Sequence, residues 1–229
     1  MTQRAREIAD NLAEVRGRIE NAAIAAERAA AEINLIVVTK TFPVADLEIL
    51  YDLGLRNFGE NRDQEAAPKA AALADDIHWH FQGQIQSKKL PSILSWAKTI
   101  HSIDQYSHAS KVNEVVTTPF EIFVQVDLQT VQNPDRGGVP LPELEALLDR
   151  LQELGNLKVM GLMAVAPLGE DPQLAFARLS KIHSQVLVSY PEYRYLSCGM
   201  SGDFEAAIAA GATHIRVGSS ILGSREPLI

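Results

Sequence analysis

Residues 35–40 read Leu-Ile-Val-Val-Thr-Lys, and this short segment decides the predicted fold. Its four aliphatic residues are consecutive, so a strand formed here would be covered on both faces, as in a parallel sheet flanked by helices. Pro43 follows closely and prevents the turn from continuing as a strand. The segment therefore predicts a buried parallel strand that ends at a polar pair, Thr39 and Lys40.

The residues before this strand have a different period. Ile8, Leu12, Val15 and Ile19 recur every three or four positions and form one apolar stripe on a helix. Ala, Glu and Arg, which favour helices, fill most of the remaining positions. We expect an extra N-terminal helix at about residues 3–31, ahead of the first strand.

The alternation of short apolar segments and helical segments continues along the chain. The expected strands are residues 35–39, 56–59, 78–82, 99–103, 120–127, 159–165, 194–198 and 213–217. Further helices are expected at residues 44–53, 62–75, 86–97, 105–117, 142–153, 172–188 and 203–210. Eight strands alternating with helices predict an α/β fold, a (β/α)8 TIM barrel forming one domain over residues 1–229. An open doubly wound sheet is the alternative, but no G-x-G-x-x-G motif follows the first strand, which removes its usual dinucleotide-binding form.

Three glycines mark the points where predicted helices stop. Gly54, Gly155 and Gly211 each follow a helical segment and precede a strand. We expect each of them to take a left-handed conformation, which glycine adopts at little cost and which ends a helix.

The composition limits the classes of function. The 229 residues are 46% hydrophobic, and 21 basic against 29 acidic residues give a net charge of −8. This excess of acid disfavours nucleic acid as a partner. The N-terminus is charged and lacks the apolar core of a secretory signal, and the aliphatic segment at 35–38 is too short to cross a membrane. With a single cysteine, Cys198, we expect a cytoplasmic protein without a disulfide and without membrane contact.

Functional residues of such barrels lie where strands end and loops begin. Lys40 ends the first strand and shares a face with Ile36 and Val38 by the two-residue period. If those side chains point into the barrel, Lys40 lies at its rim, where partial desolvation turns the amine into a nucleophile for carbonyls. A lysine that only reaches out to solvent from a strand end is the alternative.

Small polar residues follow the last two strands. Ser201 precedes a helical segment with acidic residues in its first turn, and we expect it to cap that helix. Gly218, Ser219 and Ser220 end the last strand and would expose backbone N–H groups. Together these segments predict the phosphate cradle that barrels build after strands seven and eight, which would lie beside Lys40 because strand eight closes against strand one. Two ordinary capped turns are the alternative.

Arg216, on the last strand, is a further candidate. An arginine that points into a barrel is costly unless it meets an anion or another acceptor. An outward-pointing Arg216 or a structural ion pair are the alternatives.

Other polar residues give weaker signals. His78 and His80 could share a metal by their spacing, but no third ligand accompanies them, and we expect hydrogen-bonded structural histidines. Glu60 and Asp63 are either paired acids or a solvated helix start. Cys198 is expected to be a small core residue.

Several motifs, read in order along nearly the whole chain, match one known family. They are VVTKTFP (37–43), FGEN (58–61), WHFQG (79–83), HSID (101–104), GLM (161–163), LSCGMS (196–201) and IRVGS (215–219). On these motifs the chain resembles the pyridoxal phosphate homeostasis proteins, single-domain relatives of the alanine racemase N-terminal barrel (PLP fold type III). The resemblance implies that the cofactor is pyridoxal 5′-phosphate (PLP).

The resemblance also implies roles for individual residues. Lys40 would form the internal aldimine with PLP, and Arg216 would face the pyridine nitrogen. Asn61 would lie near the ring and Met200 would pack close to it. The residues that would hold the phosphate are Ser201, Gly218 and Ser219.

For function, the resemblance implies intracellular PLP homeostasis: buffering the reactive aldehyde and delivering it to apo-enzymes that bind transiently. An arginine that donates to the ring nitrogen keeps that nitrogen unprotonated and makes the ring a poorer electron sink. The chain has no room after the barrel for the second domain of racemases, so we expect a carrier and not an enzyme. The alternatives are a PLP-dependent amino-acid racemase or lyase of low activity, and a barrel aldolase with a Lys40 Schiff base and no cofactor.

Overall fold

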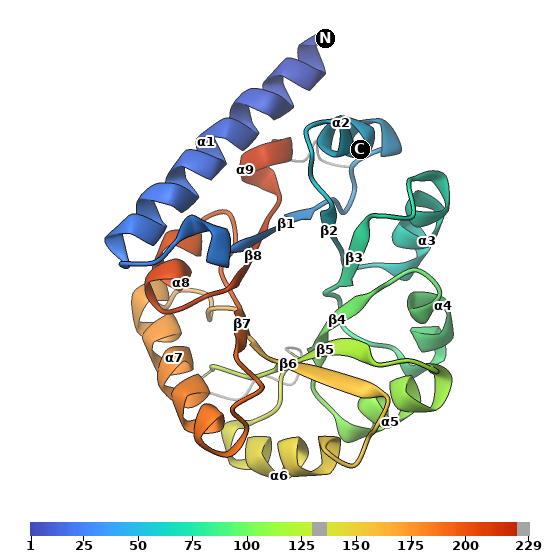
Figure 1. Cartoon of the computed structure of the whole chain (residues 1–229), viewed down its shortest axis with the longest axis vertical. Coiled ribbons are helices and arrows are strands. Elements are labelled where there is room, and N and C mark those ends of the chain that lie inside the picture. Colours follow the sequence, from blue (N-terminus) through green and yellow to red (C-terminus); the bar gives the residue numbers. More distant parts are fainter. Residues whose placement is uncertain (130–136, 224–229) are drawn as a thin grey trace.

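The computed structural model describes residues 1–129 and 137–223, which form a closed parallel barrel surrounded by helices (Figure 1). The strands follow chain order around the barrel, and the last pairs with the first. They are β1 (Asn34–Val38), β2 (Asn57–Glu60), β3 (His78–Phe81), β4 (Thr99–Ile103), β5 (Phe120–Gln125), β6 (Leu157–Met163), β7 (Tyr195–Ser197) and β8 (His214–Val217). The closed order confirms the (β/α)8 barrel over the open sheet, and each strand begins and ends within two residues of its predicted bounds.

Helices cover the outside of this barrel (Figure 1). They are α1 (Gln3–Ala25), α2 (Val44–Asp52), α3 (Asp63–Ala72), α4 (Leu90–Leu94), α5 (Tyr106–Val115), α6 (Leu141–Leu151), α7 (Pro172–Ser189), α8 (Phe204–Ala209) and α9 (Ser219–Leu222), with 3-10 turns η1 (Ala30–Glu32) and η2 (Ser87–Lys89). The sequence pattern did not predict α9. This short helix starts almost directly after β8, where the sequence predicts a phosphate cradle.

The N-terminal helix is shorter than the predicted 3–31. It ends at Ala25, and Glu27 then takes a left-handed conformation with φ 56°. The Arg28 guanidinium donates to the carbonyl oxygens of Ile208 (3.0 Å) and Ala212 (2.8 Å), so the segment after α1 is held at the end of α8. This tertiary contact stops the helix at a place where its composition would have continued it.

The N-terminal helix also supports α9. In Figure 1, α1 runs along α8 and α9 on the outside of the barrel. The Asn11 side-chain amide donates to the Ile221 carbonyl at 3.0 Å, and Arg4 donates to the Leu222 carbonyl at 2.8 Å. These bonds satisfy carbonyl groups at the end of α9, which would otherwise lack intrahelical partners. Within the described residues, no helix is long and apolar enough to cross a membrane.

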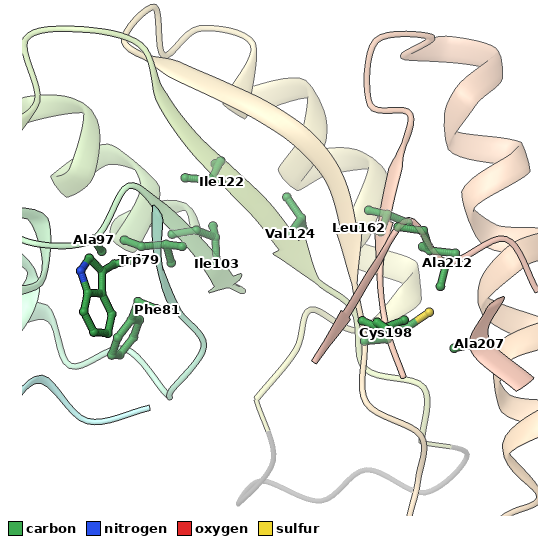
Figure 2. Close-up of a cluster of buried hydrophobic side chains, with 14 of the residues drawn as sticks. Trp79, Phe81, Ala97, Ile103, Ile122, Val124, Leu162, Cys198, Ala207 and Ala212 are labelled. Atoms are coloured by element: carbon green, nitrogen blue, oxygen red, sulfur yellow. The ribbon is translucent and has the colours of Figure 1, made fainter. Parts of the chain in front are cut away.

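The two faces of the strands bury different residues. Val37 and Phe58 belong to the main core between strands and helices, part of which Figure 2 shows around Trp79 and Phe81. Cys198 is fully buried in the same core, as predicted. Among the described residues, a second and much smaller apolar cluster has three buried members, Phe123, Met160 and Met163. Most TIM barrels fill the barrel interior with bulky branched side chains, so polar residues take an unusual share of it here.

Two of the three predicted glycine stops are confirmed. Gly54 and Gly211 have φ values of 86° and 99°. The prediction for Gly155 is wrong, because its φ is not in the left-handed region. The turn there is fixed from outside instead: the backbone N–H of Asn156 donates to the side-chain oxygen of Asn113 at 2.9 Å.

Candidate functional site

One cavity of about 290 Å³ opens at the carboxyl ends of strands β1, β2, β3, β6, β7 and β8. Its volume lies near the lower end of small-molecule sites, which run from about 300 Å³ upwards. Every cofactor-binding residue predicted from the sequence lines it. These residues are Lys40, Asn61, Met200, Ser201, Arg216, Gly218 and Ser219. The structure thus brings together residues that are spread over 180 positions of the sequence, from 40 to 219.

Lys40 lies in the turn that follows β1. It is half-buried and lines the cavity together with Val38, while Ile36 is fully buried on the same face of the strand. This confirms the expectation that the first strand directs Lys40 to the inner rim. The next residue, Thr41, has φ 72°, which is rare for a β-branched residue, and its N–H donates to Glu65 at 2.9 Å. Backbone strain of this kind persists where surrounding contacts enforce it, and it concentrates at functional sites.

A buried ion pair supports this turn from the outer side of the barrel. The Lys69 ammonium, on α3, donates to the Thr39 carbonyl (2.8 Å) and to one oxygen of Glu60 (2.7 Å). The Thr39 hydroxyl donates to the same Glu60 oxygen at 2.7 Å. Glu60 is fully buried, and burial raises its pKa although Lys69 and Thr39 oppose the effect. The pair fixes the backbone immediately before Lys40.

The sequence did not reveal this ion pair. It offered Glu60 and Asp63 as paired acids or a solvated helix start, and both readings are wrong. The Asp63 carboxylate instead accepts bonds from Ser92 (2.8 Å) and the Trp96 indole (3.0 Å). Lys69 sits within an alanine-rich helix, and its charge gave no sign that it would be buried.

Ser201, in the loop after β7, is hydrogen-bonded to the loop after β8. Its hydroxyl oxygen accepts the backbone N–H groups of Gly218 (3.2 Å) and Ser220 (3.4 Å). The prediction that Ser201 caps the next helix is wrong, because Asp203 occupies the N-cap position of α8. Since Ser201 accepts both bonds, its own proton is left to donate to a group in the cavity.

Two glycines allow the backbone of these loops to come close. Gly199 has φ 90°, and a Cβ added there would lie 2.9 Å from Cα of Phe204. A Cβ on Gly218 would lie 3.0 Å from the Val38 carbonyl oxygen. The small residues therefore keep the wall of the cavity formed largely of backbone, as sites that bind phosphate require.

Arg216 points into the barrel interior and is only 4% exposed. Its guanidinium donates to Ser197 Oγ at 2.8 Å and to the Ala164 carbonyl at 3.0 Å. Burial lowers its pKa from the usual value. Among the described residues no acidic side chain forms an ion pair with it, so the predicted alternatives of an outward arginine or a structural ion pair are wrong. A cation buried among neutral partners attracts an anion or an electron-rich acceptor to the cavity beside it.

Two further polar atoms, on residues that line the cavity, have no hydrogen-bond partner among the described residues. They are Oδ1 of Asn61 and Nε2 of Gln82, and both are buried. A Cβ on Gly59 would lie 2.5 Å from this Gln82 nitrogen, so the glycine keeps space for the amide. Buried polar groups are nearly always hydrogen-bonded, so an unpaired acceptor and an unpaired donor on two residues that line one cavity fit a site for a polar ligand. Gln82 belongs to the WHFQG motif, but the sequence analysis did not count it among the site residues.

The site does not resemble a metal centre. Within the described ranges, no group of three or more His, Cys, Asp or Glu side chains could hold a metal ion. His80 is hydrogen-bonded on both ring nitrogens, to Asn57 and to His101, which confirms the expectation of a structural histidine.

The geometry is that of a PLP-type barrel: a lysine after the first strand, small residues after the last two, and an inward arginine on the last. Sequence comparison agrees, because residues 9–226 match the family described as alanine racemase, N-terminal domain. The solved alanine racemase of Corynebacterium glutamicum shares this fold, with a TM-score of 0.71 at 14% identity over 96% of this chain and 62% of that one.

Within that class, the chain belongs to the pyridoxal phosphate homeostasis protein family. The Mycobacterium leprae protein of that name is 38% identical, over 95% of this chain and 92% of the relative. The Escherichia coli protein is 34% identical over 96% and 97%. PipY of Synechococcus elongatus, solved with PLP bound, has a TM-score of 0.82 and 34% identity and covers 94% of this chain and all of its own.

Proposed function

We propose that this protein binds PLP in the cavity at Lys40 and serves PLP homeostasis by holding and releasing the cofactor. The observation that carries the proposal is the convergence of Lys40, Arg216 and two unpartnered amides on one small cavity. The family relatives named for PLP homeostasis and the PLP-bound PipY support the same ligand.

The residues present fit PLP group by group. Lys40 supplies the amine that would hold the aldehyde covalently, Ser201 and Ser219 would supply hydroxyl and backbone donors for the phosphate, and Gly218 would let the backbone lie close to it. Asn61 and Met200 would border the ring. When bound, PLP supplies an electrophilic carbon and an electron-accepting ring.

Arg216 favours storage over turnover. A guanidinium is always charged and only donates hydrogen bonds. Placed against the ring nitrogen, it would oppose protonation there, and an unprotonated ring withdraws electrons weakly. A site of this kind holds an aldehyde while doing little chemistry on it, which suits a carrier that buffers PLP and passes it to apo-enzymes in the cytoplasm.

Absorption titration with PLP tests this proposal. The native chain should develop a visible band that saturates at one PLP per chain, and Lys40→Ala should weaken retention by at least about 100-fold because the covalent bond is lost. Lys88→Ala is the matched control, since Lys88 is exposed and lies outside the cavity. Equal titration of all three proteins would contradict the proposal.

The same preparations separate a carrier from an enzyme. PLP-loaded protein is incubated with L-alanine in deuterated water, and α-hydrogen exchange is measured by NMR. Exchange no faster than with free PLP supports storage. Rapid exchange that Lys40→Ala abolishes would support the racemase or lyase alternative.

A further inference from the structure

A continuous chain of side-chain hydrogen bonds runs through the interior of the barrel from Arg216. The links are Arg216 Nη1 to Ser197 Oγ (2.8 Å), Ser197 Oγ to His101 Nδ1 (2.8 Å), His101 Nε2 to His80 Nδ1 (2.9 Å) and His80 Nε2 to Asn57 Oδ1 (3.1 Å). It joins strands β8, β7, β4, β3 and β2 across the barrel. We call these five side chains the interior chain.

The Asn57 oxygen at one end of the interior chain fixes the direction of the bonds between neutral rings. An amide oxygen can only accept, so His80 carries its proton on Nε2 and accepts at Nδ1 from the Nε2–H of His101. A neutral His101 then accepts at Nδ1, where the Ser197 hydroxyl donates its single proton. Arg216 can only donate, and Ser197 Oγ still has a lone pair to accept from it. The arginine end is therefore compatible with the direction that the Asn57 end requires.

Both histidines are neutral in this arrangement, as their surroundings demand. His101 is completely buried and His80 is 4% exposed. Burial lowers the pKa of both rings well below the usual value, and the nearby His78, His214 and Arg216 add to the effect on His101. A protonated His80 would also place its Nδ1–H against the Nε2–H of His101.

The interior chain ends where the cofactor cavity begins. Arg216 lines the cavity, whereas Ser197, His101 and His80 do not. Since Arg216 has no acidic partner among the described residues, its position depends on Ser197 and on the Ala164 carbonyl. Hydrogen bonds that run in one direction polarise one another in a low dielectric, which strengthens the acceptor that Arg216 meets.

We infer that Ser197, His101 and His80 are positioning residues for the cofactor ring: their one-directional hydrogen bonds hold Arg216 as a donor into the cavity. This inference rests on the proposed function, since the ring is that of PLP. The interior chain gives the buried arginine a hydrogen-bond acceptor from neutral groups, where a carboxylate would otherwise accept. It keeps the full positive charge of Arg216 available to the ligand.

The direction of the hydrogen bonds in the interior chain can be tested on the native protein without PLP. Nitrogen-15 NMR of the imidazoles, assigned with His80→Gln and His101→Gln, should find both rings neutral with the proton on Nε2 between pH 5.5 and 8. A proton on Nδ1 of either ring, or a charged ring in this range, would overturn the inference. This result does not depend on whether PLP binds, so it separates failure of the chain from failure of the proposed function.

The positioning role is tested with PLP and Ser197→Ala. This variant should bind PLP about tenfold more weakly. The pKa of the PLP ring nitrogen, measured from the visible band, should rise. Ser197→Thr, which keeps the hydroxyl, should restore both values toward those of the native chain.

Ser102→Ala is the matched control, because Ser102 is also a buried strand serine with one hydrogen bond, to the Gly83 carbonyl at 2.6 Å. A merely structural serine would change neither measurement in the direction given. An unchanged affinity and pH profile in Ser197→Ala, or equal changes in Ser102→Ala, would contradict the positioning role. If Ser197→Ala fails to fold, Ser197→Thr together with the imidazole NMR decides the question.

Discussion

Buried polar atoms differ between the two ends of the barrel. We call the carboxyl ends of the strands, where the cavity opens, the mouth, and the opposite end the floor. At the floor and middle, His80, His101, Ser197 and His214 all have hydrogen-bond partners. In the described part of the chain, the buried side-chain atoms without a partner lie at the carboxyl ends of strands. They are Glu60 Oε2, Asn61 Oδ1, Gln82 Nε2 and Gln129 Nε2.

This difference distinguishes polar groups that stabilise the fold from polar groups that are placed to bind a ligand. An unpaired buried polar group destabilises the fold by about 1–3 kcal/mol. Such a group is retained where pairing with a ligand offsets this loss. Asn61 and Gln82 face the cavity of Lys40, where a ligand can pair with them. At the floor, none of the described buried side-chain polar atoms lacks a hydrogen-bond partner. Substitutions at the floor should therefore change folding stability, and those at the mouth should change ligand affinity.

The largest effect is expected at the ion pair beneath the mouth. Lys69→Met leaves the fully buried Glu60 carboxylate without its cation, which should cost about 3–5 kcal/mol in the free energy of unfolding. Urea denaturation measures this loss. Lys158→Met is the control, because the Lys158–Glu121 pair is exposed and should contribute at most about 1 kcal/mol. Similar losses in both variants would refute the assignment.

The pH dependence of this variant sharpens the same point. The folded pKa of Glu60 is already raised by burial, and removing Lys69 raises it further. A carboxyl with a raised folded pKa favours the folded state at acid pH, and this contribution disappears as the pH rises through the folded pKa. The loss of unfolding free energy caused by Lys69→Met should therefore be smaller at pH 5 than at pH 8. A deficit that grows on acidification would show that Glu60 is not the group responsible.

At the floor, His214 should make the fold sensitive to acid. Burial lowers its pKa to about 4, whereas the unfolded chain takes up the proton near pH 6.5. The stabilisation is complete above about pH 6.5 and is lost as the pH falls toward 4, at up to about 1.4 kcal/mol for each pH unit. In His214→Gln, the loss of unfolding free energy between pH 7 and 5 should be smaller by about 1–2 kcal/mol. An unchanged loss would mean that folding does not lower the pKa of His214.

At the mouth, Asn61→Ala should leave the folding stability of the ligand-free chain almost unchanged. It removes an acceptor that has no partner in the described part of the chain, yet it should weaken PLP binding about tenfold. Asn113→Ala is the matched opposite, since Asn113 accepts the backbone N–H of Asn156 and lies away from the cavity. That variant should lose about 1 kcal/mol of stability and keep its affinity. A reversed outcome for the two asparagines would break the distinction between structural and ligand-facing groups.

The sequence predicts the parts of this protein that depend on local pattern. Apolar segments of fixed period locate the strands, and the two-residue alternation places Lys40 on the inner face with Ile36 and Val38. These features need no knowledge of distant residues. Asn61 and Met200 also follow predicted strands, but only the family resemblance assigned them a place beside the ring.

The features that the sequence does not predict depend on contacts between distant residues. Ser201 has the sequence context of a helix cap, but its hydroxyl binds the loop after β8. Lys69 is buried because Glu60, from another element, neutralises it. The one-directional chain from Arg216 to Asn57 needs five strands in register, and no spacing along the sequence encodes which ring nitrogen meets which partner.

The most direct test of the account is to locate the lysine that holds PLP. The native chain is loaded with one equivalent of PLP, reduced with borohydride, digested and analysed by mass spectrometry. The account predicts a single pyridoxyl group on Lys40, in a peptide from the turn after β1. Label spread over exposed lysines such as Lys88 and Lys158, with Lys40 unmodified, would contradict it.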